Sequence, residues 1–271
     1  KPPPASSGGG AGEAPMKYIA SCSFGKDSLA MILTIIEHGL PLDEVVFYDT
    51  GMEFQALYNV RDAVLPLLHK NGIRYIELHP DRPFLYDMLE RPVKGRERRG
   101  YGWCGGLCRW GTTCKLKALD RYAESIGAKV YVGIAADEHD RLKKERKPYK
   151  IFPLASYKLT EAACLELCYA AGYFWEEDGG AGVVRLYDIL DRVSCWCCCN
   201  KNLKELRNIR KYLPLYWEKL KDLQRQLERP MKGFYKGQPR GVFELGERFM
   251  KEKAEHEKAQ EIPAPGQALD V

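Results

Sequence analysis

The side chains best suited to chemistry lie in a six-residue polar turn near the start of the chain. Residues 23–28 have the sequence Ser-Phe-Gly-Lys-Asp-Ser. The apolar residues 17–22 before this turn are typical of a buried strand, and apolar positions recur at helical spacing after Asp27. The turn therefore leads into the N-terminus of a helix, where unpaired backbone N–H groups and the helix dipole favour an anion.

Polar groups in the turn add to this anion-binding character. The ammonium of Lys26 is a point charge suited to phosphate, and Gly25 permits a close backbone approach or a positive φ. The hydroxyl donors are those of Ser21, Ser23 and Ser28. The sequence therefore predicts a phosphate-binding turn. The alternative is an ordinary strand-turn-helix in which Asp27 caps the helix.

A second group of candidate ligands consists of cysteines, of which the chain has ten. The first cluster consists of Cys104, Cys108 and Cys114. A C-x-x-C pair, Cys195 and Cys198, forms the second. Four thiolates from two such clusters suit a tetrahedral zinc site or a four-iron cluster. Adjacent cysteines cannot all direct their sulfurs to one metal, so we expect Cys197 or Cys199 to be a spare.

The elements that must position these residues alternate along the chain. After the first strand and helix, residues 44–48 predict a second strand, which ends in Asp49, Thr50 and Gly51. A helix over 53–70 and a third strand over 73–78 follow, and this alternation predicts a parallel sheet. The carboxyl ends of parallel strands carry the ligand site, so we expect Asp49 to lie beside residues 23–28.

A fourth strand over residues 129–134 brings a further polar segment, residues 135–141, to the same edge of the sheet. Two charged helices follow over 203–211 and 215–229, and a last helix follows over 243–260. We expect these C-terminal helices to pack on the domain or to form a surface for a partner protein.

Two basic segments follow strands of the predicted sheet. Residues 91–99 carry five positive charges and precede Tyr101 and Trp103, a combination that could grip a phosphate backbone or stack a base. Residues 141–147 are also basic, and the two segments together concentrate more charge than the net +5 of the chain. We therefore expect one basic rim that receives a nucleic acid or another polyanion. The alternative is a solvated basic surface.

The composition of the chain bounds its class. Its 271 residues contain no apolar run of the roughly 20 residues that a membrane span requires, and we expect a soluble, cytoplasmic protein that does not enter a membrane. We interpret residues 1–15 as a linker and residues 261–271 as a flexible tail. Between them we expect a nucleotide-binding domain over 16–175 and a cysteine-containing helical region over 176–260.

The turn at residues 23–28 resembles the PP-loop of the ATP pyrophosphatases, Ser-Gly-Gly-x-Asp-Ser, rather than a Walker P-loop. Phe24 takes the place of the first Gly, as in the branch that contains phosphoadenylylsulfate reductases and the small subunits of sulfate adenylyltransferases. Asp-Thr-Gly at 49–51 is similar to the second landmark of that branch. Residues 133–141 resemble its Gly-Ile-Arg-x-Asp-Glu-Ser-x-Arg motif, with Ala135 and His139 as departures.

This resemblance implies an α/β fold with a doubly wound parallel sheet of the adenine nucleotide alpha-hydrolase type and a helical C-terminal part. It implies an enzyme in which an acceptor oxygen attacks the α-phosphate of ATP, in sulfur transfer or nucleic-acid modification. Lys26 would hold the β- and γ-phosphates, Asp27 or Asp49 would orient Mg²⁺, and Gly133 would admit the adenosine. The implied nucleotide site comprises Ser21, Ser23, Phe24, Gly25, Lys26, Asp27, Ser28, Asp49, Thr50, Gly51, Gly133 and Asp137.

The resemblance also bears on the cysteines. In several relatives a distributed set of thiolates binds a [4Fe–4S] cluster, so iron–sulfur is favoured over zinc. The early cysteine of those relatives would fall nearer Gly111, between Cys108 and Cys114, which leaves the identity of the ligands open.

Two other functions compete with adenylyl transfer. A sulfonucleotide reductase of this branch uses a nucleophilic thiol in a Glu-Cys-Gly-x-His-type motif, and no Cys follows Cys199 in this sequence. A binding module that holds nucleotide and nucleic acid without catalysis is the other alternative, and the presence of Lys26, Asp27, Asp49 and Asp137 argues against it.

Overall fold

The computed structural model describes residues 16–95, 97, 99–145 and 147–261. Its centre is a five-stranded parallel sheet with the strand order β3-β2-β1-β4-β5. The strands are β1 (Tyr18–Cys22), β2 (Glu44–Tyr48), β3 (Arg74–Leu78), β4 (Lys129–Val132) and β5 (Lys150–Ile151). The predicted α/β fold with a parallel sheet is confirmed, and the fourth strand ends two residues earlier than predicted.

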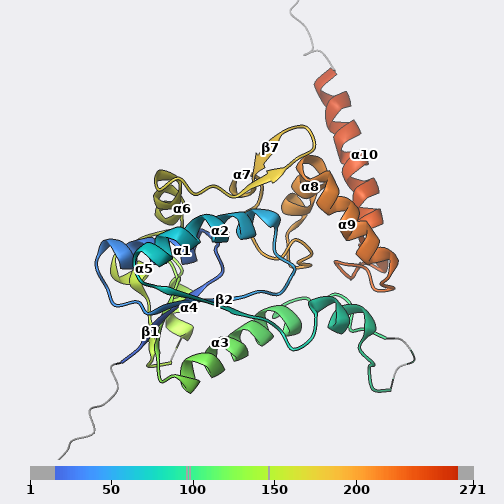
Figure 1. Cartoon of the computed structure of the whole chain (residues 1–271). Coiled ribbons are helices and arrows are strands. Elements are labelled where there is room, and N and C mark those ends of the chain that lie inside the picture. The colour runs from blue at the N-terminus through green and yellow to red at the C-terminus, as the bar shows by residue number, and fades with distance from the viewer. Residues whose placement is uncertain (1–15, 96, 98, 146, 262–271) are drawn as a thin grey trace, which may run out of the picture.

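Helices cover both faces of this sheet. Figure 1 shows α1 (Lys26–Glu37), α2 (Gln55–Lys70), α5 (Pro153–Ser156) and α6 (Glu161–Ala170) on one face and α3 (Cys114–Ser125) on the other. The apolar side chains of α3, Leu119 and Ala123, pack with Ile19, Val46 and Val130 of the strands in a small separate core. The larger core lies on the α1 face.

The interior strand β2 is buried along its whole length, including the carboxylate of Glu44, which is 1% exposed. A buried charge is costly unless it is paired and hydrogen-bonded. The Tyr122 hydroxyl of α3 donates a hydrogen bond of 2.6 Å to Glu44, and Arg74 of β3 forms an ion pair with it. This pairing ties α3 and the edge strand β3 to β2.

The loop between β3 and α3 contains two short π-helical turns, η1 (Tyr86–Glu90) and η2 (Arg109–Thr113). The helix α4 (His139–Lys144) follows β4. The C-terminal region begins with a hairpin of β6 (Glu176–Asp178) and β7 (Val183–Arg185) and the helical turn α7 (Leu186–Ile189). It continues with α8 (Leu203–Tyr212), α9 (Pro214–Arg225), a second hairpin of β8 (Phe234–Tyr235) and β9 (Gln238–Pro239), and α10 (Val242–Glu261).

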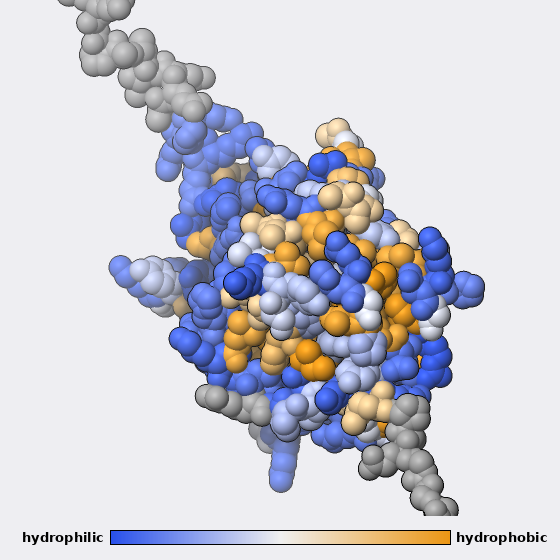
Figure 2. Space-filling model, turned by 90° about the vertical axis from the view of Figure 1, so that its left-hand side faces the viewer, coloured by the Kyte–Doolittle hydropathy of each residue, from blue (hydrophilic) through white to orange (hydrophobic). Residues whose placement is uncertain are grey.

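The C-terminal region shares the large core with the sheet. Leu206, Leu220 and Leu245 of the last three long helices are buried in the same apolar cluster as Leu29 of α1. The outer part of α10 projects from the body of the protein (Figure 1), and Figure 2 shows this projecting part as hydrophilic. The apolar core therefore continues across residue 175, and the two predicted domains share it. The domain boundary at residue 175 stays a prediction.

None of the helices in the described ranges combines the length and the apolar character that a membrane crossing requires.

The C-terminal helices begin close to where the sequence predicted them. The first residues of α8, α9 and α10 lie within one residue of the expected positions.

One hydrogen bond joins the C-terminal region to the polar turn and generates a test of stability. The indole N–H of Trp175, which is fully buried, donates to the carbonyl of Phe24 at 2.7 Å. We expect Trp175→Phe to lower the free energy of unfolding by about 1–3 kcal/mol in urea denaturation, because a buried carbonyl loses its donor. Trp103→Phe is a matched control, since that buried indole N–H has no acceptor within the described residues. Equal losses in the two variants would contradict the role of the hydrogen bond.

Candidate functional site

The polar turn between β1 and α1 is held by the hydroxyl of Ser28. This oxygen donates to the Gly25 carbonyl at 3.0 Å and accepts from the Ser23 N–H at 3.2 Å. The Ser23 and Ser28 hydroxyls are 3.3 Å apart. The predicted turn thus folds around its own serines.

The residue with a positive φ in this turn is Phe24, at 54°, and not Gly25, at −79°. A side chain in this left-handed region is strained by roughly 1–2 kcal/mol, which the packing around it must offset. The Phe24 ring is fully buried and lies edge-on to Phe47 at 5.4 Å between centroids. Gly25 instead lets the Tyr187 side chain approach the turn closely, because an added Cβ would lie 3.3 Å from the Tyr187 hydroxyl.

The first turn of α1 offers free backbone donors. The Lys26 N–H donates to the Tyr187 hydroxyl at 2.8 Å, and the Asp27 and Ser28 N–H groups have no acceptor within the described part of the chain. Free donors at a helix N-terminus, with the positive end of the dipole, make a site for an anion.

The Lys26 ammonium lies between two carboxylates, with Asp27 at 2.7 Å and Glu161 at 3.2 Å. Burial lowers the pKa of Lys26, but these two partners outweigh burial, so its pKa is raised and the ammonium stays charged. Burial raises the pKa of Asp27, while its bond to Lys26 acts in the opposite direction. The cation of the turn is thus held in place by two acidic groups.

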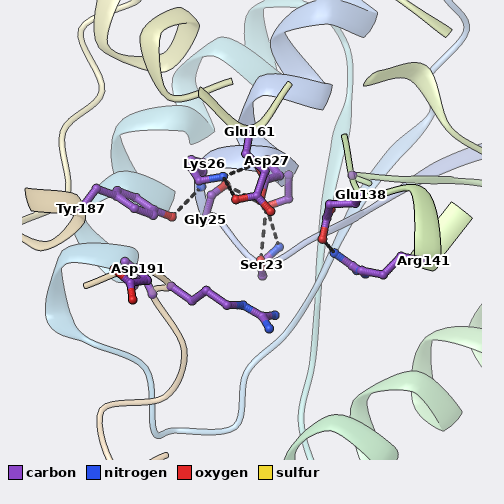
Figure 3. A pocket seen from close by; sticks show the side chains of 13 residues that line it. Ser23, Gly25, Lys26, Asp27, Glu138, Arg141, Glu161, Tyr187 and Asp191 are labelled. Carbon is purple, nitrogen blue, oxygen red and sulfur yellow. Dashed lines mark hydrogen bonds and ion pairs between the residues drawn. The ribbon is translucent and has the colours of Figure 1, made fainter. Parts of the chain in front are cut away.

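A cavity of about 180 Å³ opens over this turn. Its lining from the predicted site consists of Ser23, Gly25, Lys26, Asp27, Ser28 and Gly133. Figure 3 shows Tyr187 on one side of the turn and the ion pair of Glu138 and Arg141, 2.5 Å apart, on the other. The cavity therefore lies at the carboxyl ends of β1 and β4, where the parallel sheet predicted it.

Gly133 sets the distance between β4 and α1. A Cβ at this position would lie 3.0 Å from the carbonyl oxygen of Asp27 and from the Cα of Ser28. These are backbone atoms that cannot rotate away, so the residue that follows β4 must be glycine for the strand to approach the helix this closely.

Several residues that line the cavity were not found by sequence reasoning. Tyr187 and Arg192 come from the C-terminal region, and Glu161 begins α6. Arg192 forms no ion pair among the residues the structure describes, whereas Arg141 is paired with Glu138. No local pattern marks Tyr187, because its partner Lys26 is 161 residues away in the sequence.

Other predicted residues lie outside the lining of this cavity. Asp137 is exposed, and its carboxylate accepts a hydrogen bond from the Glu161 N–H at 3.0 Å, so it holds the start of α6. The Thr50 hydroxyl accepts from the Met52 N–H at 3.2 Å, and Gly51 takes a φ of 73° in the turn after β2. Ser21 lies within β1.

Asp49 belongs to a separate polar group at the ends of β2 and β3. Its carboxylate accepts from the Gly51 N–H and from the Tyr58 hydroxyl, each at 2.7 Å. The ligand atoms of Asp49, Glu77 and His79 lie within 4.8 Å of one another, a spacing that could hold a metal ion. Asp27 lines the cavity and Asp49 does not, so Asp27 is the better placed of the two for an ion that accompanies a phosphate there.

The two cysteine clusters come together through the segment that follows α7. The side chain of Asn200 accepts from the Gly106 N–H at 2.9 Å and donates to the Gly106 carbonyl at 2.7 Å. This pair of hydrogen bonds fixes the loop that carries Cys104 and Cys108 against the segment that carries Cys198.

The thiols of this cysteine group influence one another electrostatically. Burial raises the pKa of Cys108, and the nearby Cys104 and Cys198 thiols raise it further. The pKa of Cys199 is raised to about 11, by burial first and then by Cys198. In the part of the chain that the structure describes, no three of the cysteine sulfurs lie within 4.8 Å of one another.

Cys195 lies at the edge of this group, beside Cys198, and Cys114 lies outside it. The Cys195 thiol lies 3.8 Å from a carboxylate oxygen of Glu53 and 3.9 Å from the Thr50 hydroxyl. The Cys114 thiol donates to the Arg109 carbonyl at 3.1 Å and lines a different cavity, beside Asp87 and Lys117. The structure therefore does not bring Cys114 to the other thiols.

The predicted continuous basic rim is not formed. Strands β3 and β4 are separated by β2 and β1, and Figure 1 shows α4 and the loop after η1 on opposite sides of the molecule. Arg91 is paired with Asp87 at 2.9 Å, and Lys147 is paired with Asp120 at 2.5 Å. Three members of the predicted rim, Arg96, Arg98 and Arg146, lie outside the described residues.

Comparisons with known proteins agree with this architecture. The sequence model of the phosphoadenosine phosphosulfate reductase domain family matches residues 17–161, which is more than half of the chain. The chain is also 28% identical over 226 residues to the uncharacterized protein MJ0066 of Methanocaldococcus jannaschii. That similarity covers 75% of this chain but only 40% of the relative, so the chain spans less than half of its length.

The arrangement of the thiols generates a prediction about metal content. We expect anaerobically purified protein to contain iron or zinc, and Cys198→Ser to lose most of it, because Cys198 is the neighbour that Cys108, Cys195 and Cys199 share. Cys114→Ser is the matched control and should retain the metal. Metal analysis and the absorption spectrum measure both. Wild-type protein without iron or zinc, or equal losses in the two variants, would contradict the assignment.

Proposed function

Because the chain belongs to the phosphoadenosine phosphosulfate reductase domain family, we propose that it is an ATP-dependent enzyme that transfers an adenylyl group to an acceptor. The observation that carries this proposal is the turn at residues 23–28. Free N–H groups and a buried lysine lie at one cavity there, and the glycine after β4 lets that strand come close to α1. This combination suits a polyphosphate tail with a nucleoside beside the end of β4.

In the proposed reaction an acceptor oxygen attacks the α-phosphorus of ATP. The bond between that phosphorus and the oxygen that bridges to the β-phosphate breaks, and pyrophosphate leaves with the electron pair. Phosphoryl transfer of this kind depends mainly on position and on stabilisation of charge. Lys26 and the Asp27 and Ser28 N–H groups are the donors available for the oxygens of the leaving pyrophosphate.

Tyr187 and Arg192 extend this set of donors from the C-terminal region. The Tyr187 hydroxyl accepts from the Lys26 N–H, so its own proton remains available for a phosphate oxygen. The guanidinium of Arg192, which has no ion pair in the described structure, can bind a phosphate in a bidentate way. Asp27 is the carboxylate placed to hold a Mg²⁺ ion that arrives with the nucleotide.

The cysteine group supports a metal centre as a second part of the proposal. Relatives of this branch bind a multi-iron cluster through a similarly distributed set of thiolates, so we favour iron–sulfur over zinc. The candidate ligands are Cys104, Cys108, Cys198 and one of Cys195 and Cys199. Such a cluster would fix the C-terminal segment that carries Tyr187 and Arg192.

The assignment of Lys26 to the β/γ end of ATP gives a direct test. We expect Lys26→Ala to weaken ATP binding about tenfold or more, because a charged hydrogen bond is worth about 1.5–3 kcal/mol, and to change AMP binding much less. Isothermal titration calorimetry measures both, and release of pyrophosphate from ATP measures the activity. Equal losses of affinity for ATP and AMP would contradict the assignment of Lys26 to the β- and γ-phosphates. An ATP-binding protein that never releases pyrophosphate would instead be a binding module.

A second prediction concerns the contribution of the C-terminal region. We expect Arg192→Gln to weaken ATP binding severalfold and Tyr187→Phe to reduce the rate of pyrophosphate release, since each removes a donor to the phosphates. Arg185→Gln is the control, because Arg185 is exposed and pairs with Glu176 away from the cavity. Activity that is unchanged in both test variants would restrict the site to residues 17–161.

A further inference from the structure

Two adjoining cavities lie over the loop that carries Cys104, away from the turn at residues 23–28. The larger, of about 600 Å³, is lined by Tyr101, Trp103, Trp110 and Arg109 among others. The smaller, of about 250 Å³, is lined by Lys232 and Arg240. Trp103, Gly105 and Arg229 line both, so the two cavities adjoin, and we refer to them together as the double cavity.

The described acidic and basic residues that line the double cavity are all cations. They are Arg109, Arg229, Lys232 and Arg240, and none of the described lining residues is an aspartate or a glutamate. Cys104 and Cys199, two of the candidate metal ligands, also line it. The cavity at the polar turn differs, because four carboxylates there accompany Lys26, Arg141 and Arg192. Four cations without a carboxylate around one hollow favour an anionic ligand.

Two buried donors point to the same conclusion. Among the described residues three buried side-chain polar atoms have no hydrogen-bond partner, and two of them are Nε1 of Trp103 and Nε of Arg240. Both residues line the smaller cavity. A buried donor without an acceptor costs about 1–3 kcal/mol, so a ligand that brings acceptors to this place recovers that energy. Arg240 is already oriented, since its Nη2 donates to the Lys232 carbonyl at 2.9 Å.

Aromatic rings flank these cations. Tyr101 and Trp110 in the larger cavity have ring centroids 5.4 Å apart. The hairpin of β8 and β9, which joins Gly233 to Arg240, presents Phe234 and Tyr235 at 62% and 59% exposure. Figure 1 shows this hairpin below α9, near the loop before α3. Exposed rings beside cations are the usual platform for unpaired bases.

We propose that the double cavity binds a nucleotide unit of a single-stranded nucleic acid. The phosphate lies in the smaller cavity with Lys232, Arg240 and the Trp103 indole. The base lies in the larger cavity against Tyr101, and Phe234 and Tyr235 stack flanking bases. A duplex does not fit this arrangement, because its bases are stacked on one another and are not free to enter a cavity. The inference rests on the proposed function only where it makes the bound nucleic acid the acceptor of the adenylyl group.

Fluorescence anisotropy of the full chain, purified anaerobically and without ATP, tests the proposal. The probes are fluorescein-labelled oligouridylate and oligothymidylate, titrated over a series of KCl concentrations. We expect binding that weakens with salt. The slope of log K against log salt should become shallower by about 0.7 in Arg229→Gln and in Arg240→Gln, because each variant leaves one more phosphate without its cation. Tyr101→Ala should weaken binding about fivefold or more, because the base can no longer stack on the ring.

The matched control is Lys251→Gln, which removes one charge from the exposed face of α10. It should leave affinity and salt slope unchanged. Arg229 is exposed, so its variant keeps the test valid even if Arg240→Gln fails to fold. Absence of binding to both oligomers at low salt, or equal affinities of Arg229→Gln and Lys251→Gln, would overturn the proposal.

Two further arms separate the alternatives. Equal affinity for a duplex of the same length would overturn single-strand recognition. Competition by uridine monophosphate as strong as that by the oligomer would assign the cavity to a free nucleotide and would also overturn the proposal. Lys26→Ala should bind the oligomers like the wild type. A chain that binds them but releases no pyrophosphate from ATP would therefore refute the proposed function and leave this inference standing.

Discussion

The open N-terminus of α1 is the feature on which the rest of the structure depends. Unpaired N–H groups normally lie at the surface, yet this helix end lies in the middle of a packed domain, above Phe24 and beside β4. It is stable there because neighbouring elements supply acceptors and shape: Tyr187 takes the first N–H, and Gly133 lets β4 approach. The strained φ of Phe24 is compensated by full burial of its ring and by the Trp175 hydrogen bond.

The C-terminal region therefore completes the turn as well as packing on the sheet. Trp175 and Tyr187 both bond to backbone atoms of residues 24–26, and Arg192 reaches the same cavity. Residues beyond the part that matches the family thus supply polar groups of the site. A change in the C-terminal region is expected to alter the turn through these contacts.

The segment at residues 195–200 links two electrostatically different places. Before it, Tyr187 and Arg192 lie at a cavity with charges of both signs, where Lys26 is held by two carboxylates. Within it, Cys199 and Asn200 line a cavity whose charged residues are all cations. A balanced cavity suits a nucleotide that arrives with a metal ion, whereas an unbalanced one suits a polyanion without one. The bonds between Asn200 and Gly106 join this segment to the loop that lines the second of these cavities.

The sequence by itself determined the parallel sheet and the polar turn at residues 23–28, because both depend on patterns within a few residues: apolar strands, helical spacing, and polar residues directly after β1. It did not identify Tyr187, Arg192 or Glu161, and it placed Asp49 and Asp137 in a cavity that they do not line. The sequence also predicted that two basic segments form one surface, although the strand order separates them. It grouped Cys114 with the other thiols, although Cys114 lines a different cavity. These features were decided by tertiary structure, since contacts between residues far apart in the chain depend on strand order and on how the C-terminal region folds back, and neither leaves a local pattern.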